Sequence, residues 1–176
     1  MTSVRTIRAI VAAYVAEYRD CAAAELRYYA RQRNLARTVE LAALSKLPSG
    51  KRHPHQCRIS GIILAKAARL LAQTNFSSVS SFHDLHARVN DAISKIKGIG
   101  PLAVYDIAHR IGSHLGHAPD RVYLHRGALV GARALGLGGE AVQISDLPRP
   151  FQRLTPAEAE DCLCIYKEEL KRLSTR

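Results

Sequence analysis

The stretch Ile96-Lys97-Gly98-Ile99-Gly100-Pro101 constrains this chain more than any other, because it requires a tight turn between two helices. It has the form apolar-x-Gly-apolar-Gly, and on both sides apolar residues recur at helical spacing. Gly98 and Gly100 permit backbone angles and close approaches that a side chain would block, and we expect Ile99 to anchor the turn in a core. Pro101 suits the first position of the second helix. The sequence therefore predicts a helical hairpin.

The helical pattern extends over most of the chain. No segment shows the alternation of apolar and polar residues that is typical of a strand. The spacing of apolar residues and the Gly, Pro and cap signals predict helices over 3–34, 35–45, 59–73, 82–94, 101–115, 122–135 and 155–173. The predicted fold class is all-α.

The length of 176 residues fits one ordinary domain or two small helical lobes. We expect residues 1–176 to form a single all-α unit with a core at about 82–137. In this arrangement the N-terminal helices, residues 3–74, and the C-terminal helix, residues 155–173, pack on that core.

The charge of the chain is strongly positive and unevenly spread. The sequence holds 26 Lys and Arg against 15 Asp and Glu, a net charge of +11. Residues 1–97 hold 16 basic and 6 acidic side chains, a net charge of +10. Such an excess favours a nucleic-acid partner, and a basic domain without a polyanion partner is the alternative.

Several classes of protein are disfavoured by the composition. No apolar run approaches the roughly 20 residues of a membrane span, and the first residues lack the pattern of a signal peptide, so we expect a cytoplasmic protein without membrane contact. The four cysteines include no C-x-x-C pair and are expected to be reduced. His53, His55 and Cys57 alternate but lack a fourth ligand nearby, so we expect no metal site and no cofactor.

The turn at residues 95–100 also predicts a binding site. The amides of Gly98, Ile99 and Gly100 lead into the positive end of the next helix, where a backbone phosphate can be held. Lys95 and Lys97 add charge beside it.

A second candidate is the loop that begins at Lys51. The cations and imidazoles of this loop suit contacts to phosphates. The side chain of Gln56, at its end, could donate a hydrogen bond to a base edge. A solvated surface loop is the alternative. The candidate residues are Lys51, Arg52, His53, His55 and Gln56.

The hairpin at Gly98-Ile99-Gly100 resembles the helix-hairpin-helix motif of DNA-binding proteins. Over about residues 82–137 the chain also resembles helix-hairpin-helix DNA glycosylases of the endonuclease III type. These follow the hairpin with a helix, a loop and a V-D-x-H segment, and the corresponding segment here is Val122-Tyr123-Leu124-His125. The resemblance implies a glycosylase-like helical bundle, binding to duplex DNA through its backbone, and a role in DNA repair.

This chain departs from that family at its catalytic positions. The place of the family's nucleophilic lysine holds Leu102, and the place of its catalytic aspartate holds Tyr123, whose ordinary pKa near 10 leaves it neutral. The cysteine cluster that holds an iron–sulfur centre in some members is missing. The resemblance therefore implies the fold and DNA binding more than the reaction.

Other residues could still carry a reaction. Asp120 or Asp106 could approach a flipped nucleotide while Tyr123 stacks on the base and His125 fills the family's histidine place. Such an enzyme would be a monofunctional glycosylase, which hydrolyses the N-glycosidic bond with water and has no lyase activity. The ordinary alternatives are that Asp120 caps a helix and that Asp106 pairs with Arg110.

Three functions thus remain. The first is a DNA-binding protein that acts on or near damaged or modified DNA. The second is an atypical monofunctional glycosylase that excises a modified base. The third is a non-enzymatic subunit of a DNA-processing complex, which would have a protein partner.

Overall fold

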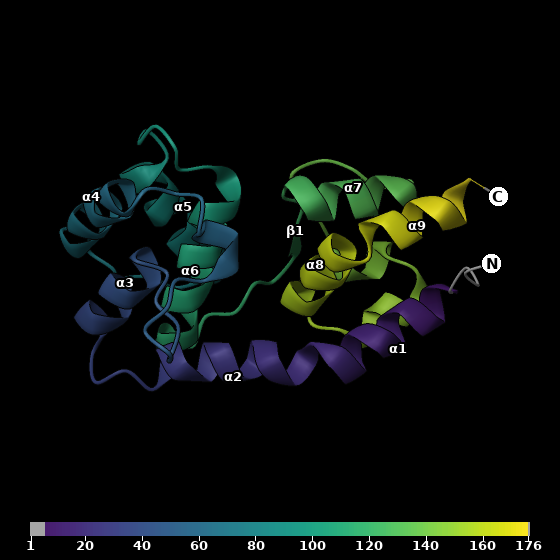
Figure 1. Ribbon diagram of the computed structural model, residues 1–176, viewed down its shortest axis with the longest axis horizontal. Helices are drawn as coiled ribbons and strands as arrows, with labels where there is room; N and C mark the ends of the chain where they lie inside the picture. The colour runs from purple at the N-terminus through teal and green to yellow at the C-terminus, as the bar shows by residue number, and fades with distance from the viewer. Residues whose placement is uncertain (1–5, 176) are drawn as a thin grey trace. The chain divides into compact units, whose positions relative to one another are not determined.

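The computed structural model describes residues 6–175, apart from the side chain of His55. The chain divides into two compact units (Figure 1). Unit 1 comprises Met1–Cys21 and Pro119–Arg176, and unit 2 comprises Ala22–Ala118. We expected a single unit with a core at 82–137, but the division at 118/119 falls inside that range.

Unit 2 is built around one buried helix. This helix, α6, packs against α3 and α5, while α4 packs against α3 and α5. Its buried residues Ala103, Ile107 and Ile111 lie at helical spacing on its core side. The elements are α2 (Arg19–Ala30), which starts in unit 1, then α3 (Leu35–Ala43), η1 (Pro54–Gln56), α4 (Gly61–Ala72), α5 (Phe82–Ile93) and α6 (Pro101–Leu115).

Unit 1 joins the first helix of the chain to its last third. Helix α7 packs against α8 and α9, and α1 packs against α8 and η3. Ile10, Tyr14, Phe151 and Leu163 are among the buried residues that form its core. The elements are α1 (Ile7–Glu17), β1 (Val122–Tyr123), α7 (Arg126–Ala134), β2 (Ala141–Val142), η2 (Ile144–Asp146), η3 (Arg149–Arg153), α8 (Pro156–Ile165) and α9 (Lys167–Ser174).

Glycine permits α7 and α8 to approach closely. A Cβ at Gly131 would overlap the backbone carbonyl oxygen of Leu163, and one at Gly127 would overlap the sulfur of Cys164. Both glycines lie on α7, four residues apart, and therefore on the same face of the helix. This contact sets the distance between the two helices.

The all-α class is confirmed, since helices dominate the described residues. The predicted helices at 35–45, 59–73, 82–94 and 101–115 match α3 to α6 within two residues at each end. The expectation of no strand is wrong in one place. Val122 pairs with Val142, and Tyr123 pairs with Ala141, in a short antiparallel sheet, so the helix predicted from 122 begins at Arg126.

Two predicted long helices are each divided in two by a tyrosine. The helix predicted over 3–34 is broken at Tyr18, and its first residues, 3–5, lie outside the described part. The closing helix, predicted over 155–173, is broken at Tyr166. The rings of Tyr18 and Tyr166 meet edge to face with centroids 6.2 Å apart, so both breaks belong to one aromatic contact in unit 1.

Candidate nucleic-acid interface

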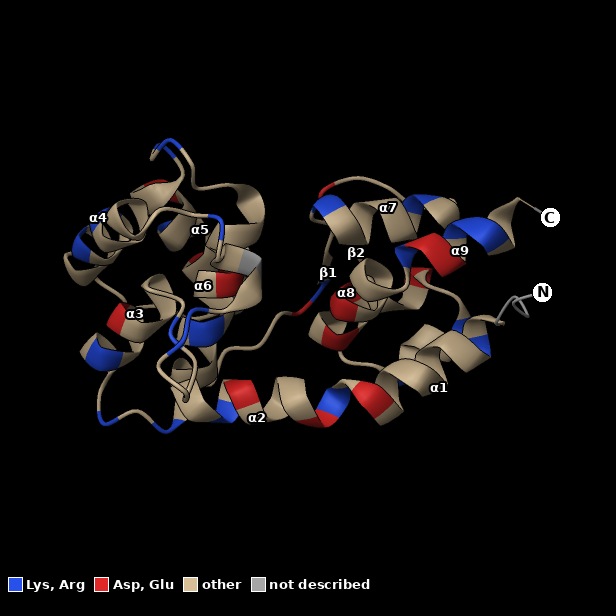
Figure 2. Ribbon diagram, viewed as in Figure 1, with Lys and Arg blue, Asp and Glu red and all other residues tan. Residues whose placement is uncertain are grey.

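The turn between α5 and α6 alternates buried anchors with exposed cations. Ile96 and Ile99 are buried, whereas Lys95 and Lys97 are exposed. The backbone N–H of Ile96 donates to the carbonyl of Ile93 over 3.0 Å, and that of Ile99 donates to the carbonyl of Ile96 over 2.9 Å. The isoleucines thus fix the turn to the core of unit 2 while the lysines face solvent. Figure 2 shows blue segments within this turn, at the edge of the unit.

The two glycines of this turn have different roles. Gly98 has φ +101°, in the region that favours glycine, and a Cβ there would lie 2.8 Å from Cδ1 of Ile63 on α4. Gly100 has an ordinary φ of −104°, and a Cβ there would meet nothing within 4 Å. The expectation that both positions need glycine for the fold is therefore corrected, since only Gly98 does.

The start of α6 leaves donors available next to these lysines. Gly100 is the N-cap residue and supplies no side-chain hydrogen bond, and Pro101 is the first helical residue. The first amides of a helix have no acceptor within the helix, and the dipole makes this end positive. The exposed residues Gly100 and Pro101 at this helix end, beside two exposed lysines, form an arrangement that can hold an anion.

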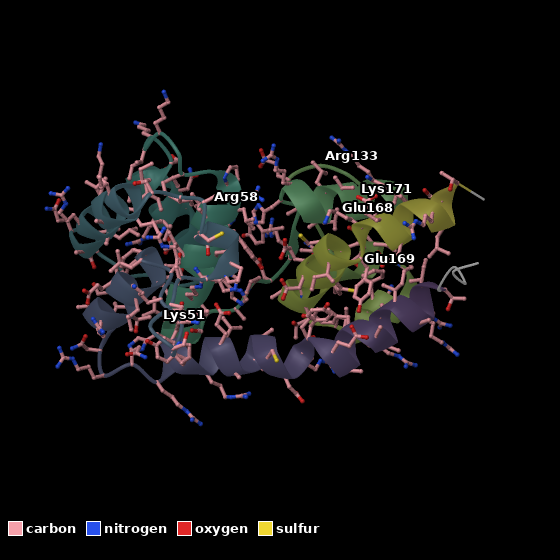
Figure 3. The ribbon with its side chains drawn as sticks, viewed as in Figure 1. Lys51, Arg58, Arg133, Glu168, Glu169 and Lys171 are labelled. Atoms are coloured by element: carbon pink, nitrogen blue, oxygen red, sulfur yellow. The ribbon has the colours of Figure 1, made fainter. Side chains whose placement is uncertain are left out.

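The loop at 51–56 is more firmly tied to unit 2 than its sequence indicates. Lys51 is exposed (Figure 3). The guanidinium of Arg52 donates to the carbonyl of Ile59 over 2.6 Å. Nε2 of His53 lies 3.3 Å from a carboxylate oxygen of Glu25. The expected role of His55 falls on a side chain outside the described part. Of Lys51, Arg52 and His53, only Lys51 is fully exposed and therefore accessible to a partner.

The role expected for Gln56 at a base edge has to be corrected. Its side chain is only 1% exposed. Its amide nitrogen donates to the carboxylate of Asp106, and its amide oxygen accepts from Arg110 over 3.3 Å. Both polar atoms of this amide are therefore used inside unit 2.

Arg110 is the centre of a buried polar network that sequence reasoning missed. Its guanidinium donates to Glu25 over 3.2 Å and to the hydroxyl of Ser45 over 3.3 Å, and lies 5.6 Å from the ring centroid of Tyr29. Burial disfavours the charged form of Glu25, but His53 and Arg110 outweigh it and hold the pKa of that carboxyl below its usual range. Gln56 links Arg110 to Asp106, so the network joins α2, α6 and the 51–56 loop.

The remaining catalytic candidates lie in unit 1, whereas Asp106 lies in unit 2. Tyr123 and His125 are nearly buried, and their rings stack with centroids 6.3 Å apart. Burial raises the pKa of Tyr123, and the charge of Asp120 adds to this effect. Asp120 is exposed and pairs with its neighbour Arg121 over 3.3 Å. His125, and not Asp120, is the N-cap residue of α7.

The net charge differs between the two units. Unit 2 contains 14 Lys and Arg against 5 Asp and Glu, a net charge of +9. Unit 1 contains 12 against 10, a net charge of +2. The positive charge of the chain is therefore concentrated in the unit that carries the α5–α6 turn.

Two other kinds of site are absent from the part of the chain that the structure describes. Among residues 6–175, leaving aside the side chain of His55, no group of three or more His, Cys, Asp or Glu side chains is placed to hold a metal ion. No helix in the same residues is long and apolar enough to cross a membrane. Comparison with protein-family models, with curated proteins and with solved structures gives no match for this chain.

Proposed function

We propose that this chain is a DNA-binding protein whose α5–α6 turn grips the phosphate backbone of duplex DNA as a helix-hairpin-helix. The observation that carries the proposal is the alternation at 95–100. Ile96 and Ile99 are held in the core, while Lys95, Lys97 and the uncapped start of α6 face solvent together. Cations and helix N-termini are the groups that bind nucleic-acid phosphates.

The charge of unit 2 supports the same partner. A net charge of +9 on one unit attracts a polyanion and raises its rate of association. Contacts of this kind position a protein on DNA without reading its sequence. We therefore expect binding that depends weakly on sequence and strongly on salt.

The resemblance to endonuclease III-type glycosylases supports a role on or near damaged or modified DNA. Tyr123 stands where that family has its catalytic aspartate, and burial keeps the phenol of Tyr123 protonated at neutral pH. A neutral phenol cannot supply the negative charge that a developing sugar cation requires. We therefore propose binding of DNA, and not base excision, as the function.

Removal of the two turn lysines tests the proposal. In the variant Lys95→Gln/Lys97→Gln we expect affinity for a 20-base-pair duplex to fall about a hundredfold or more, since each charge-assisted contact contributes about 1.5 kcal/mol or more. Fluorescence anisotropy of labelled duplex at fixed salt measures this change. Both lysines are exposed, so the fold should not change.

A matched control is available in the same unit. Arg31 and Arg33 are also exposed and have the same spacing in the turn between α2 and α3. The variant Arg31→Gln/Arg33→Gln removes the same charge and should reduce affinity less than threefold, which is below about 0.7 kcal/mol. Equal losses in both variants would show that net charge alone, and not the turn, binds DNA.

A further inference from the structure

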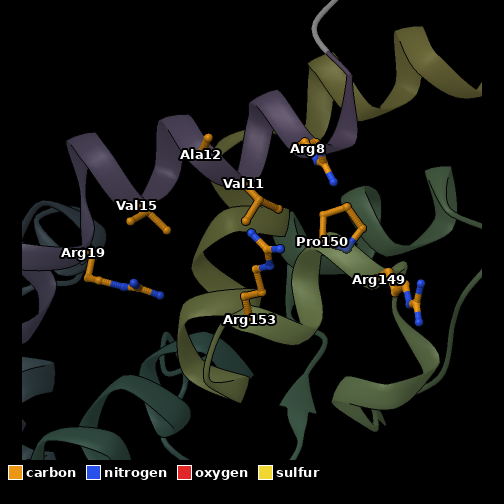
Figure 4. A pocket seen from close by; sticks show the side chains of 8 residues that line it. All are labelled: Arg8, Val11, Ala12, Val15, Arg19, Arg149, Pro150 and Arg153. Carbon is orange, nitrogen blue, oxygen red and sulfur yellow. The ribbon is translucent and has the colours of Figure 1, made fainter.

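Unit 1 contains a groove with an unusual lining. It lies between α1 and η3 and has a volume of about 620 Å³ (Figure 4). All the charged residues that line it are arginines: Arg8, Arg19, Arg149 and Arg153. Figure 4 shows the guanidinium groups of Arg8, from α1, and Arg153, from η3, pointing toward the space between the two elements. The groove is thus a local concentration of one sign of charge.

Only one of these arginines has an anionic partner within residues 6–175. Arg19 donates twice to Glu158, over 2.7 and 3.2 Å. Burial opposes the charge of Glu158, but Arg19 and the backbone N–H of Thr155 outweigh it and hold its pKa below the usual value. Arg8, Arg149 and Arg153 are exposed and make no ion pair with any described residue. Three guanidinium groups therefore remain available to an anion.

This concentration is not a consequence of the composition of unit 1. The unit has nearly equal numbers of basic and acidic residues, 12 and 10, yet no carboxylate of residues 6–175 lines the groove. Like charges that are held near one another repel, and a bound anion removes that repulsion. The geometry therefore favours an anionic ligand.

The chemistry of the lining fits a phosphate group. The planar guanidinium forks match phosphate oxygens and bind them through paired hydrogen bonds. Val11, Val15 and Pro150 supply the apolar part of the lining. Among the described residues no aromatic side chain lines the groove, so they offer no platform on which bases stack.

The length of the groove fits a strand better than a single phosphate. Its wall on α1 runs from Arg8 to Val15, which is about 10 Å at the rise of a helix. One phosphate group is much shorter than this wall, so more than one phosphate of the same strand can lie along it.

We propose that the groove between α1 and η3 is a second phosphate-binding site, which holds the backbone of a DNA strand through Arg8, Arg149 and Arg153. The inference rests on the proposed function, because it assigns this site to the same ligand. It is independent of the α5–α6 turn, since none of its residues belongs to unit 2.

The variant Arg8→Gln/Arg153→Gln tests this site in the full chain. We expect affinity for the 20-base-pair duplex to fall at least tenfold and the slope of log K against log salt to become shallower by about 1.8. Both residues are exposed and unpaired within the described part, so the far-UV circular dichroism should not change. The variant Arg133→Gln/Arg172→Gln is the control, because it removes two exposed arginines of α7 and α9 in the same unit. It should stay within threefold of the parent.

The outcomes separate this inference from the proposed function. If the turn variant loses affinity and the groove variant does not, the second site is refuted and the proposed function stands. If neither variant loses affinity, both are refuted. Polyglutamate serves as the probe for an acidic protein. The inference is overturned if polyglutamate binds the parent and not the groove variant while both bind the duplex equally well. The groove would then serve an acidic protein.

Discussion

Replacement of Arg110 by methionine should lower the free energy of unfolding of unit 2 by about 3–5 kcal/mol. Arg110 is only 3% exposed, and its side chain holds Glu25, Ser45 and Gln56 at once. Methionine fills a similar volume but leaves the partly buried carboxylate of Glu25 and the buried amide oxygen of Gln56 without this donor. Buried polar groups that lose a hydrogen-bond donor lower the stability of the folded state. Native-state hydrogen exchange of the α3 and α6 amides measures the change within unit 2.

Two further variants make the expectation for Arg110 specific. Arg37 pairs with Glu40 over 2.6 Å, but both side chains are exposed, so Arg37→Met should change stability by less than about 1 kcal/mol. Glu25→Gln combined with Arg110→Met removes the uncompensated charge and should recover part of the loss. A loss below 1 kcal/mol in Arg110→Met would contradict the central role of the network.

Substitution of Gly131 by alanine should destabilise unit 1 by about 3 kcal/mol, at the upper end of what overpacking costs. The new Cβ would meet the backbone carbonyl group of Leu163 on α8, and no change of side-chain rotamer relieves a contact with backbone. Helix α7 would have to move away from α8 and lose the packing that this contact permits. Hydrogen exchange of the α7 and α8 amides measures the effect.

Gly138 provides the control for this substitution. It lies in the same unit, and a Cβ there would meet nothing within 4 Å. Gly138→Ala should therefore change stability by less than about 0.5 kcal/mol, as surface substitutions usually do. If Gly131→Ala were equally silent, the close approach of α7 and α8 would not be a determinant of stability.

Most helices of unit 2 were predictable because local signals agree with tertiary packing there. The apolar residues of α5 and α6 recur at helical spacing, Ser81 caps α5, and Pro101 opens α6. The buried positions of the turn, Ile96 and Ile99, also follow from the apolar-x-Gly-apolar-Gly pattern. In this region each local preference favours the same structure.

The breaks at Tyr18 and Tyr166 could not be predicted in the same way. Neither glycine nor proline lies near them, and the helical spacing continues across both positions. The two rings contact each other within unit 1, and a tertiary contact of this kind leaves no local signal in the sequence. The pairing of Val122–Tyr123 with Ala141–Val142 likewise joins segments that are distant in sequence and too short for an alternating pattern.

The candidate interface was only partly predictable for a related reason. Exposure of Lys95 and Lys97 follows from their place between buried isoleucines. Gln56 was expected at the surface because it follows two cations and two histidines, but Arg110 and Asp106 draw its amide into the core. The sequence contains one signal of this buried network. Arg110 recurs at helical spacing with Ala103 and Ile107, which places it on the buried face of α6. A buried arginine requires acceptors from other elements.

The most direct test of the account is the dependence of duplex affinity on salt. The turn and the groove together provide at least four cations for phosphates: Lys95, Lys97, Arg8 and Arg153. At about −0.9 for each phosphate contacted, log K against log salt should fall with a slope of about −3.6 or steeper between 50 and 200 mM salt. A slope near zero, or no measurable binding at 50 mM salt, would contradict the claim that this protein holds DNA by its phosphates.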